Sequence, residues 1–334
     1  MDRMKAIISS TKVPATDPSA LIDTEREVPE PEARDLLVEV KAVSVNPVDV
    51  KRRASSPSGT VLGYDAAGIV RAVGDAVELF AVGDEVYYAG AVNRPGSNAE
   101  YQLVDERIVG HKPSSVSFAD AAALPLTTIT AWEVLFDRFR LHELSAGTLL
   151  VVGASGGVGS MMLQLVDALL PGVTTIGTAS RPEAVEWERS LGAAHTVDHH
   201  GDLVAQVLEI TPDGVEWIFS SHTRSLDDYA TLLKPFGQIA VIDDPKTLDV
   251  VPLKSKSAAL HWEFMFTRPV QHTPDMIVQH ELLDEVAGLV DAGRIVSTVT
   301  EKLGPLDAEQ LRAAHRMVED GRMIGKVVVS GWPT

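Results

Sequence analysis

The chain has 334 residues, which at about 150 residues per domain predicts two domains, each with its own core. Its 29 basic and 47 acidic residues give a net charge of −18, so the average surface repels a phosphate backbone and we expect no nucleic-acid partner. The absence of cysteine excludes disulfides, thiolate nucleophiles and every metal site with a cysteine ligand.

The amino-terminal segment, MDRMKAIISSTK, lacks the stretch of about 7 to 15 apolar residues that a secretory signal contains. No segment approaches the roughly 18 consecutive apolar residues that a membrane span requires. We therefore expect a cytoplasmic protein without a membrane partner.

Residues 1 to about 110 alternate short β-rich runs with Gly, Pro and Asp, which predicts a small, mostly antiparallel β domain. The predicted strands are residues 5–10, 36–45, 66–73, 84–90 and 99–104. The pattern then changes: Ser117, with Asp120 three residues later, predicts a helix start, and Pro125 interrupts that helix. We place the end of the first domain at residue 124.

From Thr148 onward, strands and helices alternate. The predicted strands are residues 148–154, 173–179, 193–198, 215–221, 237–243 and 257–264. Because these runs are apolar on both faces, they predict a doubly wound parallel sheet covered by helices, in a domain of residues 125–267. The remaining residues, 268–334, are too few for a third domain, so we expect them to return to the first one.

A glycine-rich turn lies between the first strand of this sheet and the following helix. It consists of Gly153, Ala154, Ser155, Gly156, Gly157, Val158 and Gly159. Glycines let the backbone approach a pyrophosphate closely, and the helix N-terminus offers free N–H groups. The strand before the turn and the helix after it predict a dinucleotide site rather than a merely tight turn.

The same residues also match G-x-S-x-G, the turn that presents a nucleophilic serine in α/β-hydrolases, with Ser155 as the candidate. A hydrolase turn follows several earlier strands of its sheet, whereas this one follows the first strand. No HGGG-type segment precedes it. These differences favour the nucleotide site.

The end of the second strand indicates which dinucleotide binds. A site for NAD usually places a carboxylate about 20 residues beyond the glycines, but this chain has Ser180 and Arg181 there. A hydroxyl and a guanidinium bind a 2′-phosphate well, which predicts NADPH. The alternative is that Arg181 caps a surface turn and Glu183 contacts the ribose.

Several motifs resemble those of the medium-chain dehydrogenase/reductase superfamily. Residues 63–68, GYDAAG, are similar to the GHEAAG of its zinc-containing members. Further similar motifs are Gly74, VGD at 82–84, residues 124–135 with Thr130-Ala131-Trp132, GASGGVG at 153–159, and Gly325-Lys326-Val327. The resemblance spans nearly the whole chain. It implies a GroES-like β-rich catalytic domain and a Rossmann domain with a parallel sheet.

A narrower branch is indicated by residues 180–183, 242–246 and 260–266, which resemble the zinc-type alcohol dehydrogenase-like group close to the quinone oxidoreductases. The resemblance implies a homodimer that pairs through the edge of the cofactor-domain sheet. It also implies cofactor contacts from Thr130, Ile242 and Lys326. His199, in a group with His195 and His200 at the end of the third strand, is interpreted as an adenine neighbour rather than a metal ligand.

Two of the positions that hold the catalytic zinc in this family carry other residues here. Asn46 stands in place of the first cysteine and Tyr64 in place of the histidine, and the chain has no cysteine for the third position. An amide and a phenol do not make a tight zinc site, so we expect no metal.

Without a metal, hydrogen-bond donors must stabilise the negative charge that develops on the substrate oxygen, and Asn46 and Tyr64 are the candidates. We therefore expect an NADPH-dependent, metal-independent reductase of quinones or α,β-unsaturated carbonyls. The alternatives are a reductase of saturated aldehydes or ketones, and an NADPH-binding protein without turnover. At the residue level, Asn46 is alternatively a turn residue before Pro47, and Tyr64 a buried aromatic with a satisfied hydroxyl.

Overall fold

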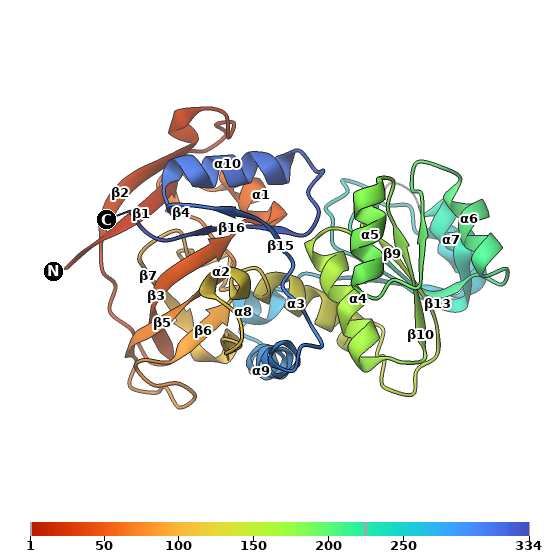
Figure 1. Ribbon diagram of the computed structural model, residues 1–334, viewed down its shortest axis with the longest axis horizontal. Helices are drawn as coiled ribbons and strands as arrows, with labels where there is room; N and C mark the ends of the chain where they lie inside the picture. The colour runs from red at the N-terminus through yellow and green to blue at the C-terminus, as the bar shows by residue number, and fades with distance from the viewer. Residues whose placement is uncertain (1, 224–225, 334) are drawn as a thin grey trace. The chain divides into compact units, whose positions relative to one another are not determined.

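The computed structural model describes residues 2–223 and 226–333, and the chain forms two compact units. The first comprises Met1–Ile129 and Phe266–Thr334, and the second Thr130–Met265 (Figure 1). The boundaries that we expected from the sequence, after residues 124 and 267, lie five and two residues from these.

The first unit is built on a seven-stranded sheet with the order β15-β16-β3-β5-β6-β8, and β7 also pairs with β3. Its strands are β3 (Asp35–Ser44), β5 (Ala66–Val73), β6 (Glu85–Tyr88), β7 (Tyr101–Asp105), β8 (Val109–His111), β15 (Val299–Leu303) and β16 (Lys326–Ser330). All pairs are antiparallel except β15 with β16. A smaller antiparallel sheet contains β1 (Arg3–Ser9), β2 (Leu21–Glu27) and β4 (Thr60–Val61).

The carboxyl-terminal segment completes this unit. Its last strand, β16, pairs with β3 through Val328 and Ser44, and the Trp332 indole donates a hydrogen bond to the Val40 carbonyl (3.0 Å). The core formed by these strands includes Leu36, Val38, Val40, Ala66, Val70, Val86, Val327 and Val329, all less than 2% exposed. The apolar character of β16 is therefore explained by its burial in the sheet.

Helices surround the sheets of the first unit. They are α1 (Pro47–Ser55), α2 (Phe118–Ala121), α8 (Thr267–Gln271), α9 (Val278–Asp291) and α10 (Ala308–Glu319), with α3 (Pro125–Trp132) leading into the second unit. Ser117 begins α2 as expected, because its hydroxyl accepts a hydrogen bond from the Asp120 backbone N–H (3.1 Å). We did not predict α1, although its start is signalled by Asn46 at the N-cap, Pro47 at the first helical position and Asp49 in the first turn.

The second unit is a six-stranded parallel sheet with the order β11-β10-β9-β12-β13-β14. Its strands are β9 (Gly147–Val152), β10 (Val173–Thr178), β11 (His195–Val197), β12 (Val215–Ser220), β13 (Leu233–Val241) and β14 (Ala259–Trp262). Helices α4 (Gly157–Leu169) and α5 (Pro182–Ser190) cover one face, and α6 (Leu203–Ile210) and α7 (Asp227–Leu232) the other (Figure 1). The prediction of a doubly wound parallel sheet is confirmed.

The strand order of this sheet reverses between β9 and β12. The chain runs outward from β9 through β10 to β11 and then returns to pair β12 with β9. In such sheets, ligands bind outside the carboxyl ends of the strands at the reversal. The glycine turn follows β9 and therefore lies at this position.

One feature that we did not predict is the π-helical segment Glu133–Arg138 (η3), in which the Phe139 N–H donates to the Val134 carbonyl (2.9 Å).

Candidate functional site

The glycine turn has a backbone that needs glycine at several positions. Gly153 has φ +81°, and a Cβ there would lie 2.1 Å from the Ser221 hydroxyl oxygen. A Cβ on Gly159 would lie 2.5 Å from the Ala154 Cα and from the Gly153 carbonyl oxygen. The glycines thus permit both a left-handed turn and close packing of α4 on β9.

The N-terminus of α4 fits an anionic group. Gly156 is its N-cap residue and carries no side chain that could accept from the first N–H groups, so these donors face the turn without an intrahelical partner. Gly157 and Val158 begin the 13-residue helix whose dipole adds positive potential at the same end. This donor set fits the diphosphate of a dinucleotide cofactor.

Other residues that we predicted to contact the cofactor follow neighbouring strands. Ser180 and Arg181 come after β10, His199 after β11, and Ile242 after β13. Because the carboxyl ends of parallel strands share one edge of the sheet, the topology brings these residues to the same edge as the glycine turn. Their contacts with a cofactor remain a prediction.

Ser155 makes no hydrogen bond to a histidine within residues 2–223 and 226–333, so nothing there supports a hydrolase turn.

Arg181 is the N-cap residue of α5, and its side chain is 42% exposed. Its guanidinium forms an ion pair with Glu183 (3.3 Å), the residue of the alternative interpretation. An exposed ion pair of this kind contributes little free energy, so a phosphate can replace the carboxylate as the partner of Arg181.

A buried acid that we did not predict lies behind the glycine turn. Glu188, in α5, is fully buried, and its carboxyl is so close to β10 that a Cβ on Gly177 would meet it at 2.3 Å. Neither carboxyl oxygen has a hydrogen-bond partner among the described residues. Burial raises the pKa of Glu188 to about 8, and the nearby Ser155 backbone N–H only partly opposes this rise. The carboxyl is therefore neutral at physiological pH.

The first unit contains a buried polar cluster made of Asn46, Asp49, Asp65 and Lys326. The Lys326 ammonium donates to the Asn46 side-chain oxygen, to Asp65 Oδ2 (3.2 Å) and to the Val45 carbonyl (3.3 Å). The Asn46 side-chain amide donates to Asp65 Oδ2 (3.0 Å) and to the Ser44 carbonyl (3.4 Å). Asn46, Asp65 and Lys326 are each less than 5% exposed.

This cluster changes the interpretation of two predicted site residues. Asn46 has its amide oxygen and nitrogen both engaged within the cluster, so it orients neighbours rather than offering a free donor. Lys326, which the family resemblance placed among the cofactor contacts, instead has its ammonium enclosed by three oxygen atoms of the first unit. Both side chains are therefore held by hydrogen bonds within the first unit, and a contact of Lys326 with a cofactor remains a prediction.

Charges in the cluster influence one another strongly. Burial raises the pKa of Asp65 and lowers that of Lys326, and each residue opposes the shift of the other. Burial raises the pKa of Asp49 to about 7, with Asp65 adding to the rise and Lys326 opposing it. One oxygen of Asp49 accepts from the Asn46 backbone N–H (2.8 Å), while the other has no partner among the described residues.

Tyr64, like Tyr88, is a buried tyrosine of the first unit. It is 1% exposed, and its ring contacts Phe266 edge-on, with 5.7 Å between the centroids. Its hydroxyl makes no hydrogen bond of standard geometry within the described part of the chain, although the Arg52 side chain lies near enough to lower its pKa. Burial raises the pKa of Tyr64, and Asp49 raises it further, while Arg52 opposes both. The raised pKa keeps the hydroxyl protonated, so it can donate a hydrogen bond, and its role as a donor to substrate remains a prediction.

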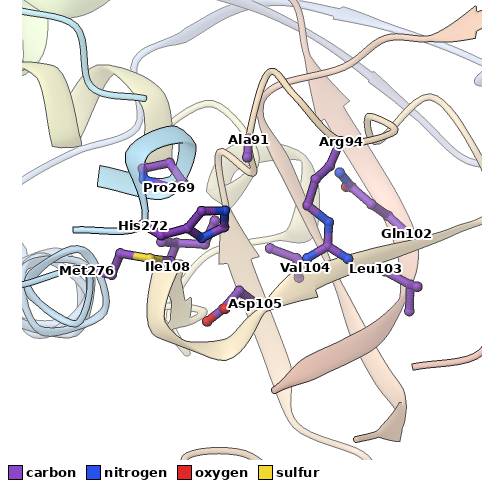
Figure 2. A pocket seen from close by; sticks show the side chains of 10 residues that line it. All are labelled: Ala91, Arg94, Gln102, Leu103, Val104, Asp105, Ile108, Pro269, His272 and Met276. Atoms are coloured by element: carbon purple, nitrogen blue, oxygen red, sulfur yellow. The ribbon is translucent and has the colours of Figure 1, made fainter. Parts of the chain in front are cut away.

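A small cavity of about 30 Å³ also lies in the first unit (Figure 2). It is lined by Ala91, Arg94, Gln102, Leu103, Val104, Asp105, Ile108, Pro269, His272 and Met276. A cavity of this size has room for a few water molecules at most. It contains none of the cluster residues and is too small for a quinone, so we do not assign it to the substrate.

Two family comparisons agree with this architecture. Residues 32–125 match the alcohol dehydrogenase GroES-like domain, and residues 191–329 match the zinc-binding dehydrogenase domain. A zinc-type alcohol dehydrogenase-like protein of Staphylococcus aureus strain COL is 42% identical over 92% of this chain and 93% of its own length. A crystal structure from Rhizobium etli CFN 42, of a protein assigned to the zinc-dependent alcohol dehydrogenases, has a TM-score of 0.96 and 48% identity, covering 100% of both chains.

The fold and these relatives show that the chain belongs to the medium-chain dehydrogenase/reductase superfamily, so its activity is that of an oxidoreductase with a nicotinamide cofactor. Within the superfamily it groups with the zinc-type alcohol dehydrogenase-like proteins. A more distant relative is the NADPH-dependent alkenal/one oxidoreductase of Arabidopsis thaliana, which is 32% identical over 90% of this chain and 73% of its own length.

Residues 2–223 and 226–333 contain no group of three or more His, Asp or Glu side chains placed to bind a metal ion together. Within the same ranges, no helix has the length and apolar character needed for a membrane span.

Proposed function

We propose that this protein is an NADPH-dependent reductase of quinones or α,β-unsaturated carbonyls that works without a metal. The observation that carries the proposal is the buried Tyr64 hydroxyl, which has no partner among the described residues and stays protonated. The names of the Arabidopsis relative and of the 2-methylene-furan-3-one reductase of Solanum lycopersicum, 31% identical over 92% of this chain and 74% of its own length, support the substrate class.

The chain's own residues supply three functions in this reaction. The glycine turn and the N-terminus of α4 hold the diphosphate, and Ser180 with Arg181 bind the 2′-phosphate. When bound there, the nicotinamide cofactor would supply a hydride, which is two electrons and a proton. Tyr64 donates a hydrogen bond, and then its proton, to the oxygen on which the negative charge develops. Solvent returns a proton to Tyr64. A quinone is then a hydroquinone, whereas an enone has become an enol, which turns into the saturated carbonyl when it loses the proton on oxygen and gains one on carbon.

We propose a reaction without a metal because of the side chains that occupy the positions of the expected zinc ligands. The chain has no cysteine, and the two positions that match zinc ligands carry Asn46 and Tyr64. Asn46 is already bound to Lys326, a cation that would repel a metal ion. Quinones and enones suit such a site because their electrons are already delocalised, so they need less polarisation than a saturated ketone.

The proposal is tested by steady-state assays with NADPH and NADH against a panel of quinones, enones, and saturated aldehydes and ketones. We expect turnover with quinones or enones and a preference for NADPH. Turnover limited to saturated carbonyls would indicate the alternative reaction. Tight NADPH binding without turnover of any substrate would indicate a binding protein.

We also propose a homodimer that forms through the edge of the second unit's sheet. The edge strand β14 ends at Trp262, whose side chain is 53% exposed, and Val251 nearby in the sequence is 68% exposed. A two-fold axis would pair the β14 strands of two copies and cover this edge. Light scattering should give twice 35.9 kDa, and a mass of one chain at working concentration would contradict the dimer.

A further inference from the structure

The loop that follows β12 lies directly against the glycine turn. The Ser221 backbone N–H and hydroxyl both donate to the carbonyl of Val152, the last residue of β9 (3.3 and 3.1 Å). A Cβ on Gly153 would lie 2.1 Å from the Ser221 hydroxyl oxygen and 3.8 Å from His222 Nδ1. Residues 221–223 therefore border the turn that fits the diphosphate.

The same loop is joined to the residues that follow β13. Ser220 and Val241, which end β12 and β13, are paired in the sheet. Beyond them, the Thr223 backbone N–H donates to Asp243 Oδ2 (2.6 Å). Asp243 Oδ1 and the Thr223 hydroxyl are both buried, and neither has a hydrogen-bond partner among the described residues. Thr223 is 7% exposed.

These two unpartnered atoms define the kind of ligand that fits between the loops. A carboxylate oxygen only accepts hydrogen bonds, so Asp243 requires a donor, whereas the Thr223 hydroxyl can donate or accept. Leaving such groups buried without partners costs free energy that a ligand can recover. The neighbouring hydroxyls of a sugar match both atoms, and a carboxylate is the usual partner of a ribose in dinucleotide sites.

The topology indicates which ribose of the cofactor this is. In a doubly wound sheet each half binds one mononucleotide, and the diphosphate lies at the reversal between them. The proposed 2′-phosphate contact of Arg181 assigns the half with β10 and β11 to the adenosine, which leaves β12 and β13 for the nicotinamide nucleoside. Its ribose is attached directly to the diphosphate, so it comes closest to the loop beside the glycine turn.

We propose that Asp243 and Thr223 bind the hydroxyl groups of the nicotinamide ribose, with Asp243 Oδ1 accepting from one hydroxyl and the Thr223 side chain bonding the other. The bond between the Thr223 N–H and Asp243 Oδ2 fixes the two residues relative to each other. The inference uses the nicotinamide cofactor of the superfamily and, for the choice of ribose, the proposed contact of Arg181. It does not depend on which carbonyl substrate is reduced.

Asp243→Asn separates this binding role from packing. The Asn oxygen can still accept from the Thr223 N–H, but an NH2 group then replaces the unpartnered oxygen and cannot accept from a hydroxyl. Calorimetric titration should show at least about 10-fold weaker binding of both NADPH and NADH, because a hydrogen bond to a charged group is lost. The probe 2′-phospho-ADP-ribose keeps this ribose without the nicotinamide and should lose the same factor. Adenosine 2′,5′-bisphosphate lacks this ribose and should bind as it does to the wild type.

A second variant and a control complete the test. Thr223→Val keeps the shape and the backbone N–H and removes only the hydroxyl, so it should weaken binding of NADPH and 2′-phospho-ADP-ribose by about 3-fold or more. It remains informative if Asp243→Asn folds poorly. Asp213→Asn makes the same charge change at the opposite end of β12, where Asp213 is exposed, and should leave the affinity for every probe unchanged.

Three results would overturn the inference. The first is wild-type affinity of both variants for NADPH and 2′-phospho-ADP-ribose. The second is equally weakened binding of adenosine 2′,5′-bisphosphate, which would place the adenosine half here. The third is a loss confined to NADPH and NADH, which would make the nicotinamide ring or its carboxamide the contact. A wild-type preference for NADH, or no turnover with any carbonyl, would instead contradict the proposed function itself.

Discussion

Glu188 provides a sharp test of the structure, because a fully buried acid without hydrogen-bond partners among the described residues must make stability depend on pH. Its pKa is about 8 in the folded protein, against 4.5 in water. Below pH 4.5 both the folded and the unfolded chain carry the proton, so the group does not oppose folding. As pH rises, the unfolded chain loses the proton first, and the free energy of unfolding falls until the pH passes about 8.

The size of this effect follows from the two pKa values. Relative to low pH, ionisation of Glu188 in the unfolded chain lowers the free energy of unfolding by about 1 kcal/mol at pH 5 and about 3 kcal/mol at pH 7. Glu188→Gln has nearly the same shape but cannot ionise. Between pH 5 and pH 7, the free energy of unfolding of the variant should therefore rise by about 2 kcal/mol relative to that of the wild type. Any effect of the substitution that does not depend on pH adds a constant difference to this.

Urea unfolding followed by circular dichroism at pH 5, 6, 7 and 8 measures this difference. Glu186→Gln is the matched control, because Glu186 lies in the same helix and is exposed; its difference from the wild type should not change with pH. If the difference between Glu188→Gln and the wild type is the same at every pH, the carboxyl is not buried as a neutral acid and the packing of α5 behind the glycine turn is wrong.

Three further predictions concern the cofactor, the metal and the dimer. Arg181→Ala should weaken NADPH binding by at least about 10-fold and leave NADH binding nearly unchanged, as measured by fluorescence titration; equal losses would exclude a 2′-phosphate contact. Exhaustive chelation should leave kcat unchanged, and elemental analysis should find well under one zinc per chain; activity that disappears with chelation and returns with zinc would contradict the metal-independent reaction. Trp262→Glu, which places a charge at the exposed end of β14, should shift light scattering from dimer to monomer, and an unchanged dimer mass would place the interface elsewhere.

Much of the second unit could be predicted from sequence because its signals are local. A strand that is apolar on both faces, followed by a glycine turn and a helix, predicted β9 and α4 to within a few residues. The family resemblance added the GroES-like unit and singled out Asn46 and Tyr64. A cytoplasmic location remains a prediction from the sequence.

The contacts that define the site could not be predicted, since they depend on distant segments. Asn46 and Lys326 are 280 residues apart, and no periodicity in either segment indicates that an ammonium meets an amide there. Glu188 is one of four acidic or basic residues in α5, and its burial follows from the way that helix faces Gly177 of β10. Tyr64 could be named as a donor from its motif position, but that its hydroxyl is buried without a partner required the packing around it.

The most direct test of the account is the turnover of Tyr64→Phe. This variant removes only the hydroxyl that the structure leaves without a partner among the described residues, and keeps the ring that contacts Phe266. If Tyr64 donates to the developing charge, kcat for the best quinone or enone should fall about 100-fold while NADPH affinity is unchanged. Wild-type kcat in a folded Tyr64→Phe would contradict the central claim and leave Tyr64 as a packing residue.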